Sequence, residues 1–204
     1  MKKILFLICA ILFTNSLVLA QQLFNLNGFQ YKVIDNRSVA VWGCYNNQDT
    51  VIIPEFVMYN NVKYTVVEIA GGAFMGKDYI VSVIIPNTVT SIGQSAFQDC
   101  ENLSSVVMPN SITNIGNCAF ASCPNLTSFT IPNSVTTIEC SAFEECDQLS
   151  TLTLGKSVST IDGLAFADCS ALKTVICLAE TPPYLRGGVF QNTAVDALDK
   201  VHEI

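Results

Sequence analysis

The chain repeats itself with a period of 23 residues over about 100 residues. Phenylalanine recurs at this spacing, each time directly after an alanine. The five phenylalanines are Phe74, Phe97, Phe120, Phe143 and Phe166. Isoleucine, cysteine, leucine and proline recur in the same phase, in series that begin at Ile69, Cys100, Leu103 and Pro86. A fixed period of this kind is typical of solenoids, in which each unit buries its apolar face only against its neighbours. The repeat therefore predicts a stack of coils.

One unit reads as two extended legs and a helical turn. The apolar side chains of residues 103–108 end in the alternation of a strand with one buried face. Pro109 ends this strand, because proline has no N–H to give to a central ladder. Residues 112–115 form an extended return leg, and the apolar spacing in residues 119–123 predicts a single helical or 3₁₀ turn. Since stacked strands lie about 4.8 Å apart, the phenylalanines are expected to form a buried spine.

The pattern resembles the leucine-rich repeat superfamily, whose core is L-x-x-L-x-L. Three consecutive units carry this core, as Leu103-x-x-Val106-x-Met108, Leu126-x-x-Phe129-x-Ile131 and Leu149-x-x-Leu152-x-Leu154. The longer unit of residues 131–146 resembles the BspA-type subclass, found on the surfaces of Bacteroidetes and other host-associated microbes. The resemblance covers about residues 49–192. It implies an α/β repeat solenoid, a right-handed leucine-rich-repeat superhelix with short parallel strands, and in some members binding of host matrix proteins or co-aggregation with other cells.

The first twenty residues have the layout of a secretory signal peptide. Lys2 and Lys3 precede an apolar run at residues 4–13, and Ala20 ends a stretch typical of a cleavage site. The run is shorter than the ~20 residues that span a bilayer. We therefore expect cleavage near Ala20, a secreted or cell-surface location, and no membrane span in the mature chain.

The ends of the repeat region differ from its middle. A hairpin is predicted for residues 29–42. A second is predicted around Asn60-Asn61, which suits a type I′ turn. The predicted organisation is a signal peptide (1–20), an N-terminal β cap and modified first repeat (21–68), a solenoid (69–180), and an irregular last repeat with a C-terminal cap (181–204). Residues 194–204 are expected to form a short closing helix.

The cysteines favour packing over chemistry. Four of the eight cysteines after residue 20 occupy one column of the repeat: Cys100, Cys123, Cys146 and Cys169. Small thiols pack well in buried ladders, so free buried thiols are predicted here. Cys118 and Cys140 lie 22 residues apart, at nearly the same position of neighbouring units. For this pair both a disulfide and two free thiols stay open. The spacing of the cysteines is not that of a zinc site.

Charge and residue inventory restrict the function. The net charge of −7, from 10 Lys+Arg and 17 Asp+Glu, argues against a nucleic-acid binder. The single histidine, His202, lies in the predicted cap and not in a shaped site, as a general base must. The acidic cluster of Glu144, Glu145 and Asp147 fits a solvated face better than a calcium site, which needs six or more oxygen ligands. We expect no enzyme activity, no cofactor and no metal site.

Binding is predicted on the outward side of the strands. There the residues between core positions form a column of hydroxyl side chains and a second, mostly β-branched column. These residues are Ser82, Ile84, Ser105, Val107, Ser128, Thr130, Thr151, Thr153, Thr174 and Ile176. Repeat proteins use such extended faces to bind, although these residue types also simply favour strands. A face without charge or aromatic rings has few hot-spot residue types and suits weak, multivalent contacts.

The functional prediction is an exported, non-enzymatic module that binds or adheres to extracellular or surface proteins. The resemblance includes host matrix proteins among these partners. One alternative is an architectural component of a cell-envelope assembly. Another is a secreted hydrolase, which needs paired carboxylates or a nucleophile with its base. The repeated unit supplies neither arrangement.

Overall fold

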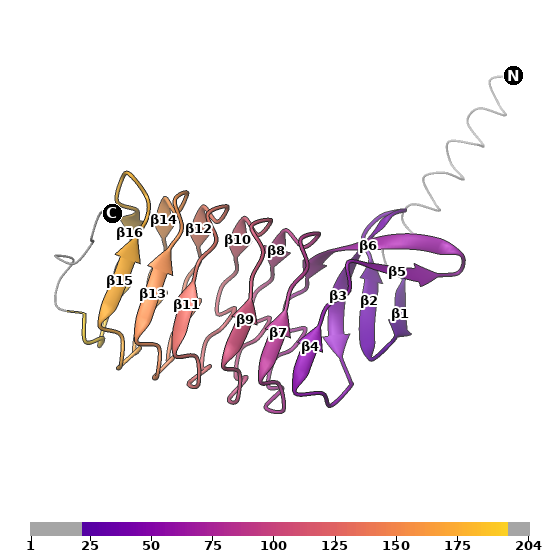
Figure 1. The fold of residues 1–204 in the computed structure, drawn as a ribbon, viewed down its shortest axis with the longest axis horizontal. Helices are drawn as coiled ribbons and strands as arrows, with labels where there is room; N and C mark the ends of the chain where they lie inside the picture. Colours follow the sequence, from indigo (N-terminus) through magenta and orange to yellow (C-terminus); the bar gives the residue numbers. More distant parts are fainter. Residues whose placement is uncertain (1–21, 196–204) are drawn as a thin grey trace, which may run out of the picture.

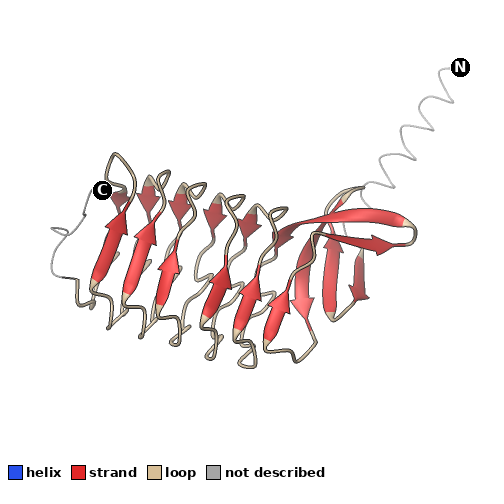
Figure 2. Ribbon diagram, viewed as in Figure 1, coloured by secondary structure: helices blue, strands red, loops and turns tan. Residues whose placement is uncertain are grey.

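The computed structural model describes residues 22–195, which form an elongated stack of coils with a β cap at its N-terminal end (Figure 1). Every regular element in this part is a β-strand (Figure 2). The predicted solenoid of short parallel strands, with its 23-residue period and N-terminal hairpin cap, is confirmed. The predicted signal peptide, and the predicted closing helix from residue 196 onward, lie outside the described residues.

One side of the stack consists of six short parallel strands, one from each coil. The central residue of each strand points into the core, because side chains alternate along a strand. These strands are β4 (Thr50–Ile52), β7 (Ser82–Ile84), β9 (Ser105–Val107), β11 (Ser128–Thr130), β13 (Thr151–Leu154) and β15 (Thr174–Cys177). They form two three-stranded sheets, β4-β7-β9 and β11-β13-β15.

The return legs build a second parallel ladder. Each is only two residues long, and its isoleucine or leucine points into the core. These strands are β8 (Ser91–Ile92), β10 (Asn114–Ile115), β12 (Thr137–Ile138), β14 (Thr160–Ile161) and β16 (Tyr184–Leu185). The ladder is continuous with the cap, because β8 pairs with β6 (Val62–Ile69).

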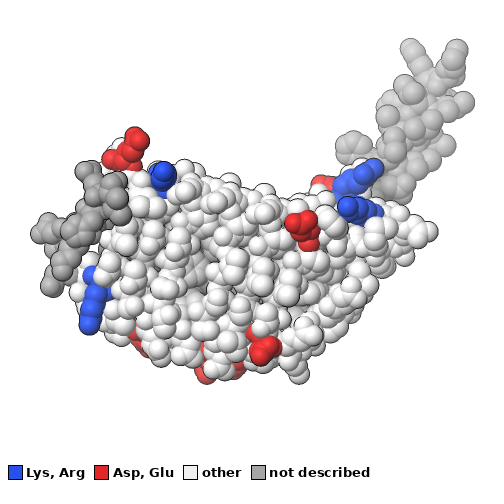
Figure 3. Space-filling model, viewed as in Figure 1, with Lys and Arg blue, Asp and Glu red and all other residues white. Residues whose placement is uncertain are grey.

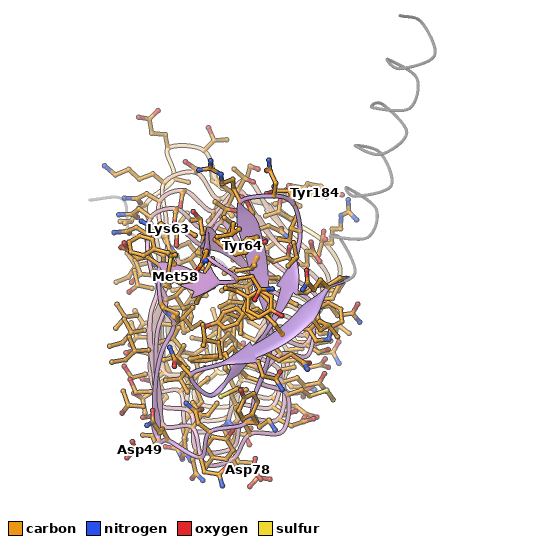
Figure 4. All side chains as sticks on the ribbon, turned by 90° about the vertical axis from the view of Figure 1, so that its right-hand side faces the viewer. Asp49, Met58, Lys63, Tyr64, Asp78 and Tyr184 are labelled. Atoms are coloured by element: carbon orange, nitrogen blue, oxygen red, sulfur yellow. The ribbon has the colours of Figure 1, made fainter. Side chains whose placement is uncertain are left out.

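The N-terminal cap contains three antiparallel pairs. β1 (Leu23–Leu26), β2 (Phe29–Val33) and β3 (Ser38–Cys44) form a meander, and β5 (Phe56–Tyr59) pairs with β6. Both predicted hairpins are therefore present. Asn60 and Asn61 both have positive φ, at 49° and 61°, as a type I′ turn requires. Seen from the cap end, Met58 and Lys63 of the β5–β6 hairpin lie far from Asp49 and Asp78 of the first coil (Figure 4).

The phenylalanine spine is buried and regularly stacked. All five rings, from Phe74 to Phe166, have no exposed surface. Successive ring centroids lie 4.9, 5.2, 5.1 and 5.1 Å apart, with interplanar angles between 3° and 14°. Phe190 continues the stack at 5.7 Å, as expected for a last, irregular copy. Each ring therefore contacts the coil before it and the coil after it, so the spine holds neighbouring coils in one phase.

The predicted helical turn is wrong in detail. Residues 116–121 form successive β-turns, in which Ala119 N–H donates to Gly116 and Ala121 N–H donates to Cys118, each at 3.1 Å. A helix cannot form because Cys118 and Ser122 both have a φ of 53°. The N–H of Phe120 donates instead to Ala142 of the next coil, at 2.8 Å. Hydrogen bonds between coils thus replace those that a helix would make within itself.

The cysteine column is buried and reduced, as predicted. Cys100, Cys123, Cys146 and Cys169 have no exposed surface, and each is a free thiol. Each S–H donates to the backbone carbonyl of a phenylalanine on the preceding coil, at sulfur–oxygen distances of 3.0–3.3 Å. Burial raises the pKa of Cys100 to about 11 and shifts the pKa of Cys123 further in the same direction. Cys100 and Cys123 are therefore protonated at neutral pH. All four buried thiols of the column serve as packing groups.

Candidate functional site

The ten predicted binding residues lie on β7, β9, β11, β13 and β15, and all are at least partly exposed. Within each sheet they stack in register. Ser82 lies opposite Ser105, and Ile84 opposite Val107. In the other sheet the two ladders are Ser128–Thr151–Thr174 and Thr130–Thr153–Ile176. The structure thus places these residues on one face as two columns, divided between β9 and β11.

The hydroxyl groups of this face are free. None of the seven serines and threonines among the ten predicted residues donates a hydrogen bond within residues 22–195. The hydroxyls beside the return legs behave differently. Thr90, Thr113, Thr136 and Ser159 each donate to a backbone carbonyl of the preceding coil. The strand face therefore offers donors and acceptors that the fold itself does not use.

The centre of the strand face carries no charge. In Figure 3 the surface over β7, β9, β11 and β13 is uncharged, and charged side chains gather at its margins and at the two ends. Two features of the sequence explain this distribution. No Lys, Arg or His occurs between Lys77 and Lys156, and the acidic residues of this span lie outside the strands. The exposed apolar residues Ile84 and Val107 lie within this neutral surface.

A groove of about 460 Å³ crosses the face where the two sheets part. It is bordered by β9 and β11, and its lining includes Ser105, Val106, Met108, Ser128 and Thr130. No backbone hydrogen bond joins β9 to β11, so the facing edges of these two strands are open.

Phe129 explains the groove. It is the bulkiest residue at the centre of these strands, and its ring contacts Phe120 and Phe143 of the spine at centroid distances of 5.3 and 4.7 Å. The ring needs more room than the valine or leucine of the other coils, and Val106 on the facing strand is only half buried. Sequence reasoning missed the groove, although the single aromatic residue in that column was the signal.

Two residues of the face were also missed. Thr50 and Ile52 of β4 pair with Ser82 and Ile84 and extend both columns by one coil. Ile52 is 62% exposed, more than any other apolar residue of the two columns. The segment Thr50–Pro54 has the same pattern as Ser82–Pro86. The inserted β5–β6 hairpin separates the two by more than one period, and the predicted face began only with the next coil.

The other candidate sites carry no chemistry that the geometry supports. Glu145 and Asp147 are exposed and line an acidic hollow of about 450 Å³ together with Asp99, Glu101 and Asp168. Within residues 22–195 no group of three or more His, Cys, Asp and Glu is placed to hold a metal ion. In the same part of the chain no helix has the length and hydropathy to cross a membrane. His202 lies outside the described residues.

An apolar pocket lies at the C-terminal end of the stack. Its volume is about 410 Å³, and Cys177, Pro182, Leu185 and Phe190 contribute to its lining. The pocket arises where the Pro182-Pro183 step interrupts the regular coil. Apart from the two prolines, its lining consists of core residues of the last two coils and residues packed against them.

Comparison with known proteins identifies the repeat. The family described as "BspA type Leucine rich repeat region" matches residues 67–195 in six copies. No protein of curated function matches the sequence significantly.

Solved structures share the fold. A leucine-rich repeat protein from Bacteroides ovatus is 25% identical, with a TM-score of 0.55, over 85% of this chain and 57% of that one. A leucine-rich cell surface protein from Faecalibacterium prausnitzii is also 25% identical, with a TM-score of 0.53, over 79% of this chain and 56% of that one. The pneumococcal vaccine antigen PcpA, 21% identical, has a TM-score of 0.72 over 85% of this chain and 48% of its own.

This chain spans little more than half of the Bacteroides and Faecalibacterium proteins. The family match covers more than half of this chain, in the phase set by the phenylalanine spine. The chain belongs to the BspA-type leucine-rich repeat family.

Proposed function

We propose that the chain is an exported, non-catalytic module that binds extracellular or surface proteins through the strand face. The observation that carries the proposal is the row of free hydroxyls on β7 to β15, beside exposed apolar residues and away from charge. Family membership supports it, because leucine-rich repeats bind partners on extended faces. The Faecalibacterium relative is a cell surface protein by its title, which fits the predicted export.

The face has the chemistry of a weak, multivalent protein contact. Its hydroxyls satisfy polar groups of a partner, and Ile52, Ile84 and Val107 supply apolar area. The open edges of β9 and β11 add backbone donors and acceptors within the groove. Because aromatic and arginine hot spots are absent from the two columns, affinity is expected to come from several coils acting together.

The test is a binding screen of the purified chain against matrix proteins and whole bacterial cells. Thr130→Arg with Thr153→Arg places two like charges in one column of the face, next to the groove. We expect this pair to weaken any binding at least tenfold, because each guanidinium must be desolvated against an uncharged surface.

The matched control is Gln94→Arg with Thr136→Arg, which adds the same charge beside the return legs at two exposed positions. Binding that survives the first pair and is lost with the control would exclude the strand face. A folded chain that binds nothing in the screen would exclude the binding function and favour the architectural role.

A further inference from the structure

Cys118 and Cys140 form one rung between neighbouring coils. The backbone N–H of Cys118 donates to the carbonyl of Cys140 at 3.0 Å. The same rung occurs one coil earlier between Ser95 and Asn117, at 2.8 Å. Both cysteines lie in turns that follow the paired return legs β10 and β12, where neighbouring coils are about 5 Å apart, within the range of ~4.4–6.8 Å between Cα atoms that a disulfide bridges.

These two thiols differ from every other cysteine that the structure describes. Cys118 is half buried and Cys140 is exposed, whereas the other six are buried. Within residues 22–195 neither S–H is donated to a protein acceptor, whereas the four column thiols each bond to a phenylalanine carbonyl. Burial raises the pKa of Cys118, and the nearby charges of Glu144 and Cys140 raise it further.

We propose that Cys118 and Cys140 are a modification site that forms an inter-coil disulfide. The oxidant is an external disulfide of the small-molecule or thiol-oxidoreductase class. The thiolate of Cys140, the more exposed residue, attacks one sulfur of that disulfide and expels the other as a thiolate. The thiolate of Cys118 then attacks the Cys140 sulfur and expels the second thiolate. The two protein thiols lose two protons and two electrons, and the external disulfide is reduced to two thiols.

The bridge encloses one complete coil. Residues 118–140 contain the β11 strand, Phe120 and Phe129, and the return leg β12. A ring of this size removes loop-closure entropy from the unfolded chain. We expect the bridge to raise Tm by about 5–10 °C for a chain of this length. The constraint falls on the coil that borders the groove between β9 and β11.

The experiment compares the chain treated with oxidised glutathione and with a phosphine reductant. Alkylation of the free thiols is followed by cleavage after glutamate and after aromatic residues, because residues 78–155 contain no Lys or Arg for trypsin. We expect one peptide pair that links Cys118 to Cys140, and a higher Tm in the oxidised sample. Oxidised chain in which both residues are still alkylated, or are linked to other cysteines or chains, would overturn the proposal.

Two variants separate geometry from reactivity. Cys118→Ser with Cys140→Ser is expected to fold, because Ser95 and Ser141 hold the same positive-φ position as Cys118. Its Tm is expected not to respond to oxidation. In that background, Ser95→Cys with Asn117→Cys moves the pair one coil earlier and is expected to restore the disulfide. Failure of both pairs to bridge would contradict the geometry. This test needs no binding partner, so its result is independent of the proposed function.

Discussion

Phe120→Ala is expected to lower the free energy of unfolding by about 3–5 kcal/mol, the usual cost of emptying a fully buried aromatic site. The ring has no exposed surface and stacks on Phe97 and Phe143 at 5.2 and 5.1 Å. It also contacts Phe129, which borders the groove. The cavity therefore opens into two coil interfaces, and these cannot collapse independently. Denaturant unfolding followed by circular dichroism measures the loss.

The matched control is Phe190→Ala. This ring has the same chemistry but stacks on one side only, at 5.7 Å from Phe166, and is partly exposed. Its loss is expected to cost less than half as much as that of Phe120, because less apolar area leaves water when it packs. Equal costs, or a loss below about 1 kcal/mol at Phe120, would mean that the spine is not a continuous buried stack.

The contribution of three buried thiols to the free energy of unfolding is expected to fall by up to about 4 kcal/mol per pH unit between about pH 9 and 11. Burial raises the pKa values of Cys100, Cys123 and Cys146 above the ordinary value of a thiol. At a pH below that ordinary pKa, the three thiols are protonated in both the folded and the unfolded chain, and their contribution to the free energy of unfolding is complete. Above it the unfolded chain loses three protons that the folded chain keeps, so stability falls as pH rises, by about 1.4 kcal/mol per thiol.

Denaturant unfolding across this pH range, with reductant present, checks the slope. Cys123→Ala is expected to reduce it by about 1.4 kcal/mol per pH unit. Ile112→Val, at another fully buried position, is the control. It is expected to lower the whole curve without changing its slope, because isoleucine does not titrate. A slope that is unaffected by Cys123→Ala would show that this thiol ionises equally in both states.

The repeat made the interior predictable. A residue type that returns every 23 positions must occupy the same environment in every coil, so Phe97 and Cys123 could be placed in buried columns without coordinates. The outward columns followed from the alternation along each strand, and the ten predicted residues are all at least partly exposed. Periodicity is strong evidence in a solenoid because only neighbouring units contact one another.

The features that periodicity cannot show are those in which one coil differs from the next. The groove depends on the volume of Phe129, which breaks the β9–β11 pairing without breaking the repeat. Thr50 and Ile52 of β4 were left out of the predicted face because an insertion separates two otherwise equivalent segments. β1 was missed although Asn27-Gly28, with φ values of 49° and 85°, is a strong hairpin signal.

The segment after each return leg, which forms the corner of the coil, was wrongly predicted as a helical turn for a related reason. An apolar spacing of one and four residues suits a helical turn, and it also suits two successive β-turns that bury the same side chains. The choice depends on where the backbone N–H groups donate. In the corner that holds Phe120, the N–H of that residue reaches Ala142 on the next coil, a partner that no local sequence window contains.

Thiol labelling under native, reducing conditions tests the shared phase of the coils most directly. The eight cysteines from Cys44 to Cys177 report on the cap and on five of the six coils. We expect rapid labelling of Cys118 and Cys140. The six buried cysteines are expected to be labelled only after unfolding: Cys44, Cys100, Cys123, Cys146, Cys169 and Cys177. Mass spectrometry of the labelled peptides assigns each site. Native labelling of Cys123 and Cys146 as fast as that of Cys140 would show that the columns do not meet in a common interior.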